Sequence, residues 1–370
     1  MLWNWRHKNW PEFTYSATKL THYEREFLHK AGMLFGTLKH ISDEDKDTLK
    51  VNLISDEAFK TSEIEGEFLS RDSLQSSIRR QFGLKTDDRR IPPAEQGIAE
   101  MMVNLYKTYD SPLSHSQLFD WHRMLTYGRR DLLDVGTYRT HDDPMQIVSG
   151  ALDNPIVHYE APPSTMVPEE MESFVKWFNG ESINLGPLIR AGIGHLYFES
   201  IHPFEDGNGR IGRAISEKAL SQSLKRPTLI AISYAIESKK KAYYSALHRS
   251  SVGLEISEWL NYFCEMVLEA QDHTQLMIDF LIEKGKYYNR YGMKFNERQM
   301  KVVRRIFREG INGFQGGLSA DNYIRITGTT ASTATRDLQK LVEIGALKRK
   351  GERKGTRYYL NIDHPSITAE

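Results

Sequence analysis

Cysteine is almost absent from this sequence of 370 residues, because Cys264 is the only one. A single thiol excludes intrachain disulfides, zinc sites built from several cysteines and redox pairs of neighbouring thiols, and it is typical of a reducing compartment. No stretch approaches the about 18 apolar residues that a membrane span needs, and the N-terminus has charges where a signal peptide needs an apolar run. The sequence therefore predicts a soluble, cytoplasmic protein with no membrane partner.

An excess of charge of either sign is also missing. Lys+Arg and Asp+Glu both number 49, so the formal net charge is zero. This balance excludes a uniformly basic nucleic-acid coat protein but not a local basic patch. The hydrophobic fraction of 39% and the charged fraction of 26% are typical of globular domains with packed cores. At this length the chain has room for two or three domains.

The apolar pattern is mainly helical and divides the chain into three predicted domains, at residues 1–110, 111–285 and 290–365. The first is a helical module with a helix start at Ser70 or Asp72. In the second, which begins with a helix capped by Ser114, two β-rich runs between residues 146 and 159 predict a small hairpin. In the third, three helices precede a β-hairpin, which predicts a winged helix-turn-helix.

The segment from His202 to Arg213 reads HPFEDGNGRIGR and carries the strongest chemical signal. Gly207, Asn208 and Gly209 tolerate positive φ, so their backbone can turn N–H groups inward around an anion. A helix that starts near Arg210 would add its free N–H groups and dipole, which favour phosphate. Asp206 offers a hard ligand for a divalent metal, and His202 offers a base.

Two other interpretations of the same segment fit less well. Residues 207–212 formally match the dinucleotide fingerprint G-x-G-x-x-G, but no strand precedes them and no acidic residue follows at the required distance. The G-x-x-x-x-G-K-[ST] pattern of phosphate-binding loops is absent from the sequence. A plain glycine-rich surface turn would not need a histidine, an aspartate and two arginines at fixed spacing.

Residues 202–213 match the signature HPFx(D/E)GNGRxxR, and the chain resembles protein adenylyltransferases of the Fic family. The resemblance covers about residues 114–251 as the Fic core, and the tryptophan-rich N-terminus is similar to the first module of a bacterial subgroup that ends in a winged helix. It implies a Fic-type helical core with a small β-hairpin flap. It also implies transfer of AMP from ATP, with Mg²⁺, to a Tyr, Thr or Ser hydroxyl of a target protein.

The resemblance assigns a role to each matching residue. His202 is the general base and Asp206 the Mg²⁺ ligand. The nucleotide is bound by the anion hole, by two arginines and by the adenine contacts, which correspond to Gly207, Asn208, Gly209, Arg210, Arg213, Tyr244 and Leu247. The hairpin at residues 146–159 is the flap on which an extended target segment pairs. Self-modification is expected.

Upstream, Thr61, Glu65 and Gly66 fit the inhibitory pattern (S/T)xxxE(G/N) of the same family. Thr61 and Glu65 fall on one face of a helix, four residues apart. The resemblance implies that Glu65 pairs with Arg213 and removes the cationic partner of the ATP γ-phosphate. In some relatives this glutamate also supports removal of AMP from the target. A solvated surface glutamate is the alternative for the motif taken alone.

The predicted winged helix leads to an alternative function, a DNA-binding regulator whose Fic site acts on another phosphate-containing substrate. Its third helix carries, in its early part where a recognition helix meets bases, Ser332, Thr333, Thr335 and Arg336. The hairpin at residues 347–360 is rich in Lys and Arg, which suits phosphate contacts. The sequence leaves open whether this domain binds DNA or protein, whether the chain is a homodimer, and which protein is the target.

Overall fold

The computed structural model describes residues 2–39, 41–151, 154–228, 230–314 and 316–363. The chain forms two compact units. Unit 1 comprises residues 1–37 and 50–274, and unit 2 comprises residues 38–49 and 275–370. Among the described residues, no helix is both long enough and apolar enough to cross a membrane.

Helices dominate the structure, and the strands occur as two separate antiparallel pairs. The α-helices and strands are α1 (Ala17–Leu38), α2 (Asp43–Ile64), α3 (Arg71–Gln81), α4 (Pro93–Lys107), α5 (His115–Leu125), β1 (Gln146–Ala151), β2 (Asn154–Glu160), α6 (Val167–Asn179), α7 (Pro187–Ile201), α8 (Asn208–Leu224), α9 (Ile232–Ser238), α10 (Lys240–Ser250), α11 (Ser257–Tyr291), α12 (Glu297–Arg308), α13 (Ala320–Thr327), α14 (Ala331–Glu343), β3 (Leu347–Lys350) and β4 (Arg357–Leu360). The predicted mainly α fold with small hairpins is confirmed.

Local capping determines where several helices begin. The Ser70 hydroxyl accepts a hydrogen bond from the Ser73 N–H at the start of α3, and Ser114 does the same for the Gln117 N–H at the start of α5. These bonds satisfy backbone donors that the first helical turn leaves without an intrahelical partner. Both helix starts agree with the sequence prediction, with Ser70 rather than Asp72 as the cap of α3.

The centre of unit 1 is the pair α7 and α8, which pack along each other. Helix α7 starts at Pro187, a residue suited to the first helical position, and buries every following residue up to Ile201 except Glu199. A helix that is apolar on all sides is stable only when other helices surround it. The residues that follow it, from His202 to Gly207, are therefore supported by the core of unit 1.

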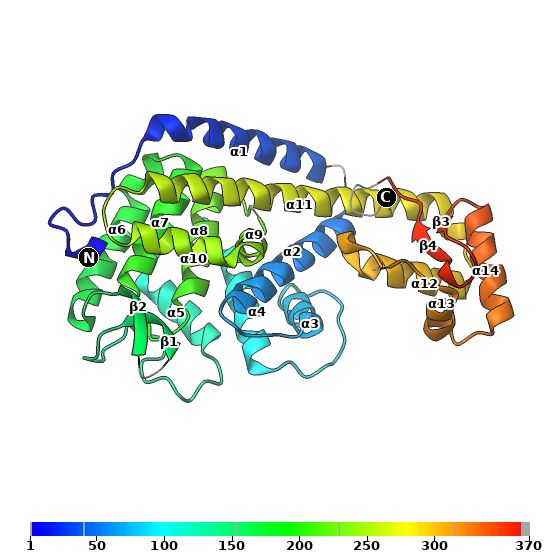
Figure 1. Cartoon of the computed structure of the whole chain (residues 1–370), viewed down its shortest axis with the longest axis horizontal. Helices are drawn as coiled ribbons and strands as arrows, with labels where there is room; N and C mark the ends of the chain where they lie inside the picture. Colours follow the sequence, from blue (N-terminus) through cyan, green and yellow to red (C-terminus); the bar gives the residue numbers. More distant parts are fainter. Residues whose placement is uncertain (1, 40, 152–153, 229, 315, 364–370) are drawn as a thin grey trace. The chain divides into compact units, whose positions relative to one another are not determined.

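The hairpin predicted between residues 146 and 159 is present as β1 and β2 (Figure 1). The paired residues run from Gln146 opposite Glu160 to Ala151 opposite Asn154. A register shift between Ile147 and Val148 marks a bulge. Residues 152 and 153 of the predicted flap lie outside the described residues.

Unit 2 contains the predicted three helices followed by a hairpin, α12, α13, α14 and then β3 with β4. Asn296 and Ser319 form capping boxes at the starts of α12 and α13. Helix α11 continues to Tyr291, beyond residue 285, where the second domain was predicted to end. Its last part carries apolar residues of the unit 2 core, including Tyr287.

Candidate active site

His202 lies directly after α7 in a left-handed backbone conformation, with φ 49° and ψ 59°. This conformation is uncommon for a residue with a β-carbon and costs about 1 kcal/mol or more. The His202 N–H still closes the helix by donating to the Phe198 carbonyl. The strained backbone ends α7 at this residue and turns the chain into the loop that follows.

The loop from Pro203 to Gly207 is folded by its own side chains. Asn208 Oδ1 accepts from the Phe204 N–H at 2.9 Å, and Asn208 Nδ2 donates to the Phe204 carbonyl at 2.8 Å. Gly207 precedes α8 with φ 83°, a conformation that glycine adopts without strain. The Asn208 side chain therefore fixes the loop in front of α8, whose first N–H groups have no intrahelical partner.

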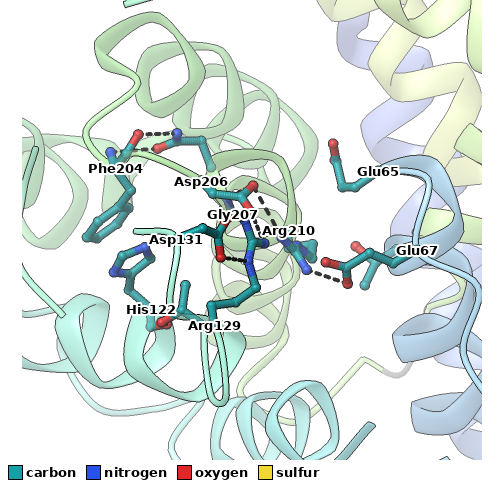
Figure 2. A network of polar contacts seen from close by, with 12 residues as sticks. Glu65, Glu67, His122, Arg129, Asp131, Phe204, Asp206, Gly207 and Arg210 are labelled. Carbon is teal, nitrogen blue, oxygen red and sulfur yellow. Dashed lines mark hydrogen bonds and ion pairs between the residues drawn. The ribbon is translucent and has the colours of Figure 1, made fainter. Parts of the chain in front are cut away.

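Two buried residues, His122 and Arg139, contact this loop. The His122 ring stacks on Phe204, with ring centroids 4.3 Å apart, and its Nδ1 accepts from the Gly136 N–H (Figure 2). The Arg139 guanidinium donates to the carbonyls of His202 at 2.9 Å and Pro162 at 2.5 Å. Burial lowers the pKa of His122 to about 4, so this ring is neutral and structural at neutral pH.

Asp206 is held by arginines on both sides, as Figure 2 shows. Its Oδ2 accepts from Arg129 Nη1 at 2.7 Å, and its Oδ1 lies 3.4 Å from Arg210 Nη2. Arg129 is in turn held by the Asp131 carboxylate through two hydrogen bonds of 2.8 and 2.6 Å. Burial alone would raise the pKa of Asp206, but Arg210 and Arg129 outweigh it and lower this pKa below its usual value.

The donor set around Asp206 fits a magnesium ion that arrives with a nucleotide. Within the described ranges, no group of three or more His, Cys, Asp or Glu residues could hold a metal ion alone. Mg²⁺ commonly uses one or two protein carboxylates, together with waters and substrate phosphate oxygens. A single carboxylate at the start of a helix that favours anions meets this requirement, provided that Arg129 releases Oδ2.

Arg213 is bound by the C-terminal turn of α2. Its Nε donates to Thr61 Oγ1 at 2.7 Å, and its Nη2 donates to Glu65 Oε1 at 2.7 Å and to the Thr61 carbonyl at 3.0 Å. The Arg213 side chain is buried, whereas that of Glu65 is about a quarter exposed. A β-carbon on Gly209 would clash with the same Glu65 oxygen, so this glycine gives the carboxylate its place.

Arg210 forms a separate ion pair with Glu67. Its Nη1 donates to Glu67 Oε2 at 2.7 Å, and the pair is drawn in Figure 2. Gly66, which separates Glu65 from Glu67, has φ 85° and reverses the chain after α2. The two arginines of the sequence motif are thus each paired with a different carboxylate of one short segment.

The predicted adenine contacts lie on α10. Tyr244 is partly exposed, and it is close enough to Glu65 and Arg213 for both to influence its pKa, which burial raises above the usual value. Leu247 packs against the core of unit 1. Tyr243 next to it is buried and hydrogen-bonds to His195, so Tyr244 is the tyrosine of this pair that can meet a ligand.

Glu199 is a buried carboxyl group beside His202. Its Oε2 lies 3.8 Å from His202 Nδ1, and its Oε1 has no hydrogen-bond partner among the residues described. Burial, reinforced by the charge of Glu65, raises the pKa of Glu199 to about 8. This shift favours the protonated form of the carboxyl group beside the imidazole.

The structure brings the predicted site residues together in two sets of contacts, Arg213 with Thr61 and Glu65, and Arg210 with Asp206. Sequence reasoning missed four titratable side chains that lie in or beside the site, namely Glu67, Arg129, Arg139 and Glu199. Glu67 could have been found from its position two residues after Glu65. Arg129 and Arg139 are 77 and 63 residues distant in sequence from their partners in the loop, so no local pattern indicated them.

Comparison with family models gives two matches. Residues 112–220 match the Fic/DOC family, and residues 3–84 match a domain of unknown function, DUF4172. The first match contains the loop with His202 and the arginines of α8. The second contains the α2 segment with Thr61, Glu65 and Glu67.

Among curated proteins, the chain is 29% identical over 150 residues to "Protein adenylyltransferase fic-1" of Caenorhabditis elegans, covering 40% of this chain and 26% of that protein. It is 32% identical over 95 residues to "Probable protein adenylyltransferase aq_aa38" of Aquifex aeolicus (strain VF5), covering 26% of this chain and 27% of that protein. The chain thus spans about a quarter of the length of these relatives.

Among solved structures, the chain is similar to a Fic family protein from Desulfovibrio desulfuricans G20. The TM-score is 0.54 at 19% sequence identity, and the match covers 95% of this chain and 98% of that one. At this identity the likeness concerns the fold. It extends over nearly the whole length of both chains.

Proposed function

Because this chain carries a Fic/DOC family domain over residues 112–220, we propose that it transfers AMP from ATP to a hydroxyl group of a protein side chain. The names of the curated relatives, which call them protein adenylyltransferases, support this type of reaction. The observation that carries the proposal is the position of His202 shortly before the start of α8, whose first two turns contain Arg210 and Arg213.

In the proposed reaction the target hydroxyl oxygen attacks the α-phosphorus of ATP. A new oxygen–phosphorus bond forms, the bond from the α-phosphorus to the bridging oxygen breaks, and pyrophosphate leaves. His202 accepts the hydroxyl proton. The phosphate chain must be held in line for this displacement, which is the task of the α8 N–H groups, Arg210 and Arg213.

The environment of His202 keeps it in the form of a base. Burial lowers the pKa of His202 to about 4, and the charge of Arg139 adds to that shift. The imidazole is consequently neutral at physiological pH and can take a proton. Asp206 would hold Mg²⁺, which when bound supplies positive charge to the phosphates.

We further propose that the contacts of α2 with Arg213 inhibit the enzyme. A γ-phosphate that enters the site needs the same guanidinium that Glu65 and Thr61 occupy. Glu57 and Lys60 hold α2 in this place, because they bind Ser233 and Glu237 of α9. Replacing Glu65 should therefore free Arg213 while α2 stays folded.

The flap formed by β1 and β2 is the proposed docking site for the target segment. Apolar side chains are exposed on both strands, including Ile147, Val148 and Ile156. The sheet has only these two strands within the described chain, so a target strand could add to it by β-augmentation. A second copy of this chain would be the first such target, which leads to self-modification.

Intact-mass spectrometry after incubation with ATP and Mg²⁺ tests the reaction. The proteins to compare are wild type, Glu65→Gly, and Glu65→Gly combined with His202→Ala. We expect the added mass of AMP in the Glu65→Gly variant and its loss when His202 is also replaced. The position of the modified side chain follows from fragmentation of the labelled protein.

Two results would count against the proposal. Equal initial rates for wild type and Glu65→Gly, at matched ATP and metal, would remove the inhibitory role of Glu65. Absence of AMP from every variant, with ATP binding shown by calorimetry, would indicate a different transferred group or a regulator with a silent site.

We also propose a second function for unit 2, which is DNA binding. Ser332, Thr335 and Arg336 are exposed on the first half of α14, as expected for a recognition helix. Lys348, Arg349 and Lys350 are exposed along β3. Binding to random duplex should weaken steeply between low and moderate salt, because phosphate contacts release counter-ions. No binding at low salt would remove this function and leave the enzyme proposal intact.

A further inference from the structure

Arg210 has a counter-ion that belongs to no recognised motif. Its guanidinium is 3% exposed, and its Nη1 donates to Glu67 Oε2 at 2.7 Å. Its other contact is a longer one, of 3.4 Å, with Asp206 Oδ1. The buried Nε of Arg210 has no hydrogen-bond partner among the described residues. This arginine thus retains capacity for another anion.

Glu67 is the replaceable partner in the pair. Its side chain is 35% exposed, so it reaches Arg210 from the surface and can return to water at little cost. Arg210 cannot follow it, and a buried guanidinium without an anion is strongly unfavourable. A phosphate that displaces Glu67 would restore the missing negative charge. The pair is therefore arranged for exchange of one anion for another.

The backbone brings Glu67 to this place independently of Glu65. The Glu67 N–H donates to the Ser62 carbonyl at 2.9 Å, and Gly66 in the left-handed region makes that return possible. Glu65 points to Arg213 and Glu67 to Arg210, and these two arginines lie three residues apart on one face of α8. The two carboxylates thus occupy two separate positions of the phosphate site.

We propose that Glu67 is a second inhibitory residue, which blocks the Arg210 part of the phosphate site as Glu65 blocks the Arg213 part. The proposal rests on the proposed function, because it takes Arg210 to be a phosphate ligand. Metal binding at Asp206 would strengthen the competition between Glu67 and phosphate for Arg210, since Asp206 would then no longer serve as a partner of this arginine. The inhibitory segment consequently extends from Thr61 to Glu67.

Equilibrium binding tests this without any turnover. The probe is α,β-methylene-ATP with Mg²⁺, which cannot lose pyrophosphate, and the dissociation constant is measured by calorimetry at fixed ionic strength. The variants are Glu67→Gln, Glu65→Gln and both together. Glu63→Gln is the matched control, because Glu63 precedes the same turn but pairs with Lys60. Inorganic triphosphate serves as a second probe that needs only the phosphate site.

We expect Glu67→Gln to tighten binding by about fivefold, Glu63→Gln to leave it unchanged, and the double variant to show about the product of the two single effects. Unchanged affinity in Glu67→Gln, or an equal gain in Glu63→Gln, would overturn the proposal. So would failure of the double variant to bind either probe. Loss of AMP transfer with the expected affinities would refute the proposed function alone.

Discussion

Arg213 and Thr61 are joined by two hydrogen bonds, from Nε to the hydroxyl at 2.7 Å and from Nη2 to the backbone carbonyl at 3.0 Å. Thr61 is 1% exposed and lies one turn before Glu65 on α2. The threonine therefore fixes the direction of the guanidinium, and the glutamate supplies the charge. An arginine held at both its Nε and its Nη2 cannot rotate toward a phosphate without leaving α2.

Replacing Thr61 with valine should release part of the inhibition. Valine keeps the shape of threonine but removes the acceptor for Arg213 Nε, which is worth about 1 kcal/mol or somewhat more for a charged donor. We expect the initial rate of AMP self-modification to rise by about fivefold over wild type. Thr61→Ser, which keeps the hydroxyl, is the control and should stay near the wild-type rate. A rate for valine equal to that for serine would contradict this role.

Gly66 should control both carboxylates through the backbone. It has φ 85°, and an added β-carbon would meet no neighbouring atom within 4 Å, so any penalty is conformational. Alanine in the left-handed region costs about 1–2 kcal/mol, whereas asparagine tolerates it better. We expect Gly66→Ala to raise nucleotide affinity and AMP transfer, and Gly66→Asn to retain inhibition. Calorimetry and intact mass measure the two effects, and equal behaviour of both variants would show that the turn is not needed.

Local sequence signals predicted much of the fold. Ser70 and Ser114 each accept the backbone hydrogen bond of a helix start, and such caps can be recognised in a sequence because donor and acceptor are three residues apart. The hairpin at residues 146–159 and the three helices with a hairpin in unit 2 could also be predicted, because their signals lie within short stretches of the sequence. The end of α11 could not be predicted, because its final residues are buried by the distant segments of unit 2.

The site was predictable where its groups lie within a few residues of one another. The motif from His202 to Arg213 contains a histidine, a carboxylate and two arginines within 12 residues. The ions that neutralise them come from elsewhere in the chain, as Arg129 shows for Asp206 and Glu67 for Arg210. The sequence motif shows which charged side chains need a partner. Which of the many acidic residues and arginines becomes that partner depends on tertiary packing.

Arg129 should compete with the metal ion for Asp206. In the structure it donates to Asp206 Oδ2, one of the two oxygens that could bind a metal ion, and Asp131 holds it there. In the Glu65→Gly background, Arg129→Gln is expected to lower the metal concentration for half-maximal binding by about threefold to tenfold. Electron paramagnetic resonance of Mn²⁺ with α,β-methylene-ATP measures this directly.

Arg130→Gln is the matched control for the metal experiment, because Arg130 is exposed and adjacent in sequence. A general loss of positive charge would change metal binding in both variants equally. If Arg129→Gln instead required a higher metal concentration for half-maximal binding, Arg129 would be a ligand of the bound phosphates. Either result would contradict competition at Asp206.

The pH dependence of AMP transfer should report the burial of His202. Because burial lowers the pKa of His202 to about 4, protonation should not remove the base until the pH falls toward that value. The charge of Glu65 raises the pKa of His202, so removing this charge lowers the pH at which His202 becomes protonated. We expect kcat/KM of the Glu65→Gly variant to stay level down to about pH 5.5, where an exposed histidine with a pKa near 6.5 would have lost about tenfold.

The free energy of unfolding also depends on pH, so unfolding must be excluded as a cause of any fall in kcat/KM at low pH. Burial also lowers the pKa of His122 to about 4 and that of His195 to about 3, so the unfolded chain binds more protons than the folded chain between these values and about 6.5. Their contribution to stability is complete above about pH 6.5 and is lost as the pH falls through that window. Circular dichroism at each pH should therefore accompany the rates. A tenfold fall in kcat/KM at about pH 5.5 in protein that is still folded would show that His202 titrates as an exposed histidine in the working enzyme.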